Sequence, residues 1–130
     1  MKDRVFVDTN VFVYTQSSVE PQKRSVSLKV LEQYDCCIST QILSEISNVM
    51  IKKLKMRIDE VRQVLAAVNA KCSVITIRYT TIQKALNLKE RYEHSFYDSL
   101  VLASALESDC QKTFLKMASG LLLNGKTLWV

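Results

Sequence analysis

The most constraining stretch of the sequence is a short apolar run near its start, Val5-Phe6-Val7, which ends directly at Asp8. Consecutive β-branched and aromatic residues without polar alternation are typical of a strand covered on both faces, as in a parallel sheet. An ionised carboxylate is costly to bury unless it is paired or bound to a metal. Ligands of open α/β sheets bind just outside the carboxyl ends of the strands. Asp8 is therefore either a site residue or the cap of the helix that follows.

The remainder of the chain alternates short apolar runs with helical stripes, and this pattern predicts βα units. The expected strands, after the one at Val5, are 36–39, 73–77, 113–115 and 126–130. The expected helices are 10–16, 22–34, 40–55, 58–71, 79–92 and one that opens at Ser95. The sequence thus predicts a single α/β domain over residues 1–130, with a short, mostly parallel sheet flanked by helices.

Size and composition are those of an ordinary globular domain. A chain of 130 residues with 48% hydrophobic and 24% charged residues can bury a core without disulfides or a structural metal. No apolar run reaches membrane-spanning length and no signal-peptide core is visible, so the expected location is the cytoplasm, away from membranes. The formal charge of +5 suits a nucleic acid or an acidic protein as partner.

Four cysteines and one histidine narrow the possible site chemistry. The cysteines have no Cys-x-x-Cys spacing, so we expect small buried hydrophobic residues rather than zinc ligands. His94 lies in a charged turn and is expected to be exposed. The absence of a glycine-rich phosphate loop argues against a nucleoside-triphosphate or dinucleotide enzyme.

Two further acids occur in apolar surroundings. Glu45 lies between Ile42 and Val49 in the helix 40–55, at the margin of its apolar face. Asp98 lies in the first turn of a helix that is apolar nearly all round. Ser95, three residues before Asp98, matches a capping box, so a purely structural role for Asp98 is an alternative.

These three acids, Asp8, Glu45 and Asp98, are each expected at the end of a strand or in the first two turns of the helix after one. In a parallel sheet such positions open onto one edge. Carboxylates that meet there raise one another's pKa unless a cation holds them. A site of oxygen ligands suits Mg²⁺ or Mn²⁺, which can activate a water and offset charge during phosphodiester cleavage.

Taken together, the motifs resemble those of the PIN domain, and in particular the VapC-type ribonuclease toxins of prokaryotic toxin–antitoxin pairs. The resemblance extends over essentially the whole chain, and its carriers are Val7-Asp8-Thr9-Asn10-Val11, Ser44-Glu45, Ser95-Phe96-Tyr97-Asp98-Ser99-Leu100-Val101 with Ala103 and Ala105, and the tail 121–130. It implies a PIN-like three-layer sandwich that closes with a hairpin in the tail.

The resemblance also implies a function. Asp8, Glu45 and Asp98 would form a catalytic site for Mg²⁺ or Mn²⁺, and Thr9 and Asn10 would shape its first turn and contact the substrate. The substrate would be RNA. Members of the family usually form homodimers and are held inactive by a cognate antitoxin.

A cluster of basic residues follows Glu45 at the end of its helix: Lys52, Lys53, Lys55 and Arg57. The lysines are candidate contacts to an RNA backbone, which would add affinity and salt dependence without sequence preference. The alternative is a solvated helix end, where positive charge is favourable.

One segment departs from the family pattern. PIN domains of this type usually carry a further acid after the strand that follows the Asp98 helix, but residues 114–119 contain none and Asp109 lies too early. The alternative function is therefore a catalytically impaired PIN domain that binds RNA or an antitoxin. A phosphatase or phospho-receiver domain is disfavoured, because the phosphatase pattern requires Asp-x-Asp and its second position is Asn10.

Overall fold

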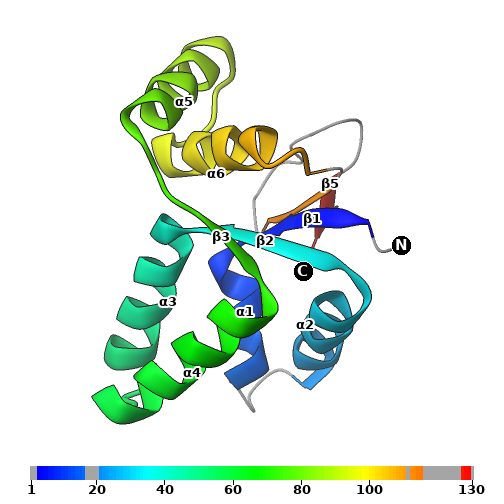
Figure 1. Cartoon of the computed structure of the whole chain (residues 1–130), viewed down its shortest axis with the longest axis vertical. Coiled ribbons are helices and arrows are strands. Elements are labelled where there is room, and N and C mark those ends of the chain that lie inside the picture. Colours follow the sequence, from blue (N-terminus) through cyan, green and yellow to red (C-terminus); the bar gives the residue numbers. More distant parts are fainter. Residues whose placement is uncertain (1–2, 17–20, 111, 116–126, 130) are drawn as a thin grey trace.

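The fold is a five-stranded parallel sheet between two layers of helices, in a computed structural model that describes residues 3–16, 21–110, 112–115 and 127–129. The strands lie in the order β3-β2-β1-β4-β5, and their bounds are β1 Arg4–Val7, β2 Asp35–Ser39, β3 Ser73–Ile75, β4 Lys112–Leu115 and β5 Thr127–Trp129. The helices are α1 Thr9–Gln16, α2 Pro21–Gln33, α3 Thr40–Lys52, α4 Ile58–Lys71, α5 Tyr79–Arg91 and α6 Phe96–Glu107. Helices α1 to α4 cover one side of the sheet, and α5 and α6 the other (Figure 1). The predicted three-layer α/β class is confirmed.

The central strand is β1, which pairs with β2 on one side and β4 on the other. Val5, Phe6 and Val7 are completely buried, as the unalternating run predicts for a strand covered on both faces. The same core contains the apolar stripe of α3, formed by Ile42, Ile46 and Met50. Strand β1, which precedes Asp8, is therefore paired along both edges and buried on both faces.

Helix α6 is also confirmed as a buried helix. Every residue from 99 to 105 is buried, because the helix lies between the sheet and α5 (Figure 1). Ala85 of α5 packs with Leu100 and Ala103 of α6.

In the described parts of the chain, no helix has the length and apolar character needed to cross a membrane.

Two expected elements end earlier than the sequence pattern indicates. Helix α3 stops at Lys52 instead of residue 55, because the chain turns into a left-handed conformation at Lys55, with φ of 54°. Strand β3 stops at Ile75 instead of residue 77, because the N–H of Ile77 donates to Oγ1 of Thr40 at 3.1 Å and not to the sheet. The chain thus leaves the edge strand to join the start of α3.

At the end of the chain, β5 pairs in parallel with β4. The other half of the expected hairpin, and residues 116–119 of the segment without an acid, lie outside the described residues.

The four cysteines are free and buried, and they lie in two pairs, Cys36 beside Cys72 and Cys37 beside Cys110. Nε of Arg4 donates to Sγ of Cys37 at 3.1 Å. The hydrogen bond from Cys110, together with the Arg4 guanidinium, lowers the pKa of the Cys37 thiol to about 6 against the opposing effect of burial. Burial as such agrees with the sequence, whereas the charge beside Cys37 was not expected from it.

The cap of α3 provides a test of how firmly this helix is anchored. Ser39 is fully buried, and its Oγ accepts the N–H of Ile42 at 3.4 Å. Because this bond satisfies a free amide at the helix start, Ser39→Ala should lower the free energy of unfolding by about 1 kcal/mol in urea denaturation. The control is Ser44→Ala, at an exposed serine of the same helix, which should change stability by less than about 0.5 kcal/mol. Equal losses in the two variants would contradict the capping role.

Candidate active site at the carboxyl edge of the sheet

Asp8 lies between the last residue of β1 and the first residue of α1, and it is partly buried. Its Oδ1 accepts the N–H of Thr9 at 2.8 Å, and its carbonyl oxygen accepts the N–H of Val11 at 3.2 Å. The carboxylate therefore occupies the N-terminal end of α1, where the helix dipole favours negative charge. A role in the helix start and a role in a site are compatible in this geometry.

Glu45 accepts two hydrogen bonds, one at each carboxylate oxygen, and one of them comes from Thr9, the neighbour of Asp8. Oε2 accepts the hydroxyl of Thr9 at 2.5 Å, and Oε1 accepts Nε2 of Gln41 at 2.9 Å. Thr9 is buried, while Glu45 is partly buried at the margin of the apolar stripe of α3. Through Thr9, the structure brings together two acids that are far apart in the sequence.

Asp98 reaches the same side of the molecule by a different route. Its helix follows α5 and not a strand, so the expectation that each acid lies at a strand end or just after one is wrong for Asp98. Helix α6 runs back to the start of β4, which is parallel to β1, and so it begins on the side of the sheet where the strands end (Figure 1).

The start of α6 has only half of the expected capping box. Oγ of Ser95 accepts the N–H of Asp98 at 3.1 Å, so the serine is the cap. The carboxylate of Asp98 is partly buried and makes no hydrogen bond to another described residue. The capping part of the structural alternative is therefore fulfilled by the backbone of Asp98, while its carboxylate lies in the first turn of α6, where the helix dipole favours negative charge.

The three acids do not form one cluster here. Among the described residues, no group of three or more His, Cys, Asp or Glu side chains is close enough to hold a metal ion. Asp8 and Glu45 are linked, and Asp98 is not gathered to them, so the three-acid metal site stays a prediction. The oxygens of the linked pair are of the type that Mg²⁺ and Mn²⁺ prefer, and in that respect the residues fit such an ion.

The other candidate RNA contacts lie in two places, the first turn of α1 and the C-terminal end of α3. Asn10 is partly buried in the first turn of α1, beside Asp8 and Thr9. Lys52 lies two turns beyond Glu45 on nearly the same face of α3, about 10 Å along the helix axis. The three lysines are exposed, with Lys53 and Lys55 beyond the last helical residue.

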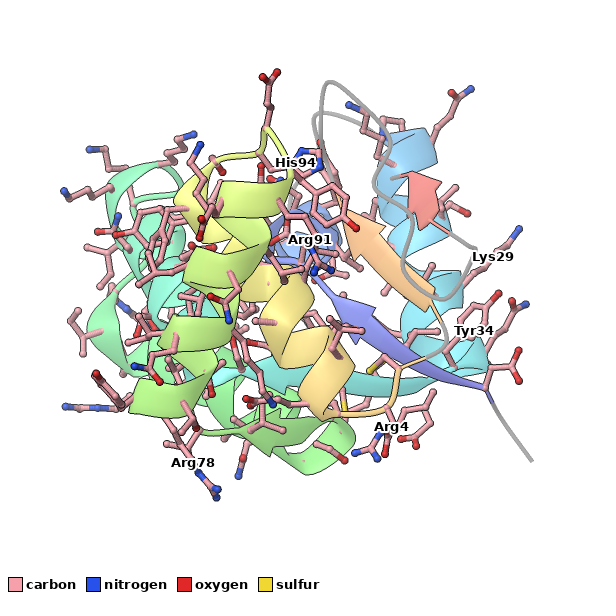
Figure 2. All side chains as sticks on the ribbon, turned by 90° about the horizontal axis from the view of Figure 1, so that it is seen from above. Arg4, Lys29, Tyr34, Arg78, Arg91 and His94 are labelled. Carbon is pink, nitrogen blue, oxygen red and sulfur yellow. The ribbon has the colours of Figure 1, made fainter. Side chains whose placement is uncertain are left out.

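His94 lies against a neighbouring aromatic ring. It lies in the turn after α5, and its ring stacks on Tyr92 with centroids 6.2 Å apart. Figure 2 shows it near Arg91, at the end of α5 opposite Arg78. The residue is partly buried and not fully exposed as expected.

Sequence reasoning missed Gln41, which contacts Glu45 directly. The available signal was its position four residues before an acid that lies at the edge of an apolar stripe, because such residues are neighbours on a helix.

The geometry thus defines an α/β domain with a pair of linked carboxylates where its strands end. The sequence profile described as the PIN domain matches residues 5–114 of this chain. The chain belongs to the PIN-domain family.

Solved structures of VapC toxins and of toxin–antitoxin complexes share this fold. VapC20 of Mycobacterium tuberculosis, a sarcin-ricin loop cleaving toxin, has a TM-score of 0.69 and 15% identity, covering 84% of this chain and 86% of that one. VapBC2 of Rickettsia felis, bound to a DNA fragment of its promoter, has a TM-score of 0.69 and 14% identity over 98% of both chains. A toxin–antitoxin complex from Klebsiella pneumoniae has a TM-score of 0.64 and 17% identity, with coverages of 85% and 84%. No curated protein matches the chain significantly in sequence.

Proposed function

We propose that this protein is a metal-dependent endoribonuclease of the VapC type, the toxin of a toxin–antitoxin pair. The observation that carries the proposal is the linked pair of Asp8 and Glu45 beyond the central strand of a PIN-family domain. Asp98, at the start of α6, is proposed as the third acid of the site. RNA as the substrate class is supported by the structural neighbour VapC20, a sarcin-ricin loop cleaving toxin.

The metal that suits this site is Mg²⁺ or Mn²⁺, held by Asp8, Glu45 and Asp98. When bound, such an ion lowers the pKa of a water and offsets the charge of the leaving oxygen in phosphodiester hydrolysis. The chain's own contribution is orientation. Thr9 donates its N–H to Asp8 and its hydroxyl to Glu45, so one residue aligns both carboxylates.

The substrate would approach along α1 and α3. Asn10, in the first turn of α1, is proposed to contact RNA together with Thr9. Lys52, Lys53 and Lys55 are exposed, and they are proposed to bind phosphates of the backbone beyond the acids. Such contacts release counterions, so affinity for RNA should fall steeply as the salt concentration rises.

An antitoxin is the proposed protein partner. The structural neighbours from Rickettsia felis and Klebsiella pneumoniae are toxin–antitoxin complexes, which supports a partner of the same kind for this chain. A homodimer is proposed on the basis of the family.

The second candidate is a catalytically impaired PIN domain that acts by binding RNA or the antitoxin. The observation in its favour is the sequence 114–119, which contains no acid where the family pattern usually has one. In this case a second metal would lack its expected ligand.

Metal removal tests the proposal. The purified protein is incubated with a structured RNA in Mg²⁺ or Mn²⁺, in excess EDTA, and after the metal is restored, and the products are resolved by gel electrophoresis. We expect cleavage with either metal, none in EDTA, and recovery on restoration. Binding of the RNA without cleavage would favour the impaired candidate, and an absence of both would contradict the proposal.

A further inference from the structure

The carboxylate of Glu45 is held from two sides by residues of different helices. Thr9 of α1 donates to Oε2, and Gln41 of α3 donates to Oε1. Because each oxygen has its own donor, the plane of the carboxylate is defined and cannot rotate without losing one bond.

The orientation of the Gln41 amide follows from this contact. An ionised carboxylate only accepts hydrogen bonds, so the Gln41 atom that faces it is the NH₂ group. The amide carbonyl Oε1 is then buried, and it accepts no hydrogen bond from any described residue. Leaving a buried acceptor without a donor is unfavourable. The amide therefore donates to Glu45, while its own carbonyl oxygen has no donor among the described residues.

The backbone around Gln41 is anchored on both sides. Ser39 caps α3 through the N–H of Ile42. The Thr40 hydroxyl accepts the N–H of Ile77, which ties the first turn of α3 to the connection between β3 and α5. Gln41 lies within this anchored turn, one helical turn before Glu45, and can hold the carboxylate without moving itself.

We propose that Gln41 is a positioning residue of the candidate site: its amide, with the hydroxyl of Thr9, holds the Glu45 carboxylate in the orientation that binds a divalent cation. This inference rests on the proposed function. Residues that orient metal ligands typically contribute 10-fold to 100-fold to metal affinity or activity.

Calorimetric titration with Mn²⁺ tests the role independently of catalysis. Gln41→Met keeps the length of the side chain and removes the amide, and we expect it to weaken Mn²⁺ binding at least about 10-fold. For RNA cleavage we expect kcat to fall with little change in KM, since Gln41 acts through Glu45. The matched control is Gln63→Met, the same change at an exposed position of α4, which should leave both quantities unchanged.

A double-mutant cycle separates positioning from a general structural role. If Gln41 acts through Glu45, Gln41→Met should have almost no further effect on Mn²⁺ binding in a Glu45→Gln background. Equal losses in both backgrounds would show a general structural effect and overturn the inference. Should Gln41→Met fold poorly, as judged by circular dichroism, Gln41→Ala removes the same amide with a good helix-forming residue and carries the same expectation.

The metal site and the positioning role of Gln41 can be refuted separately. If the wild-type protein binds no Mn²⁺, the metal site and the proposed function fail together. If the wild type binds Mn²⁺ and Glu45→Gln binds it more weakly, while Gln41→Met binds as well as the wild type, only the role of Gln41 is refuted.

Discussion

Replacing Asp8 by Asn should reduce kcat for RNA cleavage by about 10³-fold or more, with the fold intact. The substitution removes a negative charge where a divalent ion would bind, and such a site contributes several kcal/mol to the transition state. It keeps the size of the side chain and an oxygen for the N–H of Thr9. Single-turnover cleavage of a labelled RNA in Mn²⁺ measures the effect.

The same substitution separates the two roles of Asp8. Asn is as good a helix cap as Asp, so a residue that only begins α1 should tolerate Asn with full activity and unchanged stability. Retained cleavage would therefore refute the catalytic assignment and support the capping alternative.

The matched control for Asp8→Asn is Asp109→Asn. Asp109 lies between the end of α6 and the start of β4. Asp109 is exposed and has φ of 54°, a conformation that Asn also adopts readily. We expect wild-type cleavage from this variant. A comparable loss would show that the effect of Asp8→Asn is not specific to the candidate site.

Replacing Phe6 by Ala should lower the free energy of unfolding by about 3–5 kcal/mol, the range for large cavities in cores. Phe6 has no exposed surface and lies in the middle strand, paired with Cys37 on one side and Thr113 on the other. The loss is a large part of the 5–15 kcal/mol that stabilises a typical domain. The midpoint and slope of urea unfolding measure it.

Leu86→Ala is the control for this prediction. Leu86 is 52% exposed on α5, so its truncation should change stability by no more than about 0.5 kcal/mol. If Phe6→Ala costs as little as Leu86→Ala, the central position of β1 in the core is wrong.

Elements whose burial follows from local composition could be predicted from the sequence. The run Val5 to Val7 is a buried central strand, and α4 has the predicted bounds of residues 58–71. Helix α6 is buried as its apolar composition indicates. In each case the pattern of apolar side chains within one element predicts how much of that element is buried.

Helix α5 shows where such patterns are insufficient. Two of its larger apolar residues, Ile82 and Leu86, are 37% and 52% exposed, while Thr81 and Ala85 are fully buried. The small side chains face α6, and the hydroxyl of Thr81 donates to Glu107 at 2.9 Å. Which face of α5 is covered depends on the close approach of α6, and no local periodicity reports it.

Some features of the candidate site could likewise be predicted from the sequence, and others could not. The sequence by itself determined the acids Asp8, Glu45 and Asp98 as site candidates, since an acid in an apolar pattern is costly unless it has a partner. Only the tertiary structure decided that Thr9 joins Asp8 to Glu45, that Gln41 faces Glu45 and that, among the described residues, Asp98 is not gathered with them. The physical reason is that burial is encoded by spacing within one segment, whereas contacts between distant segments depend on the path and packing of the whole chain.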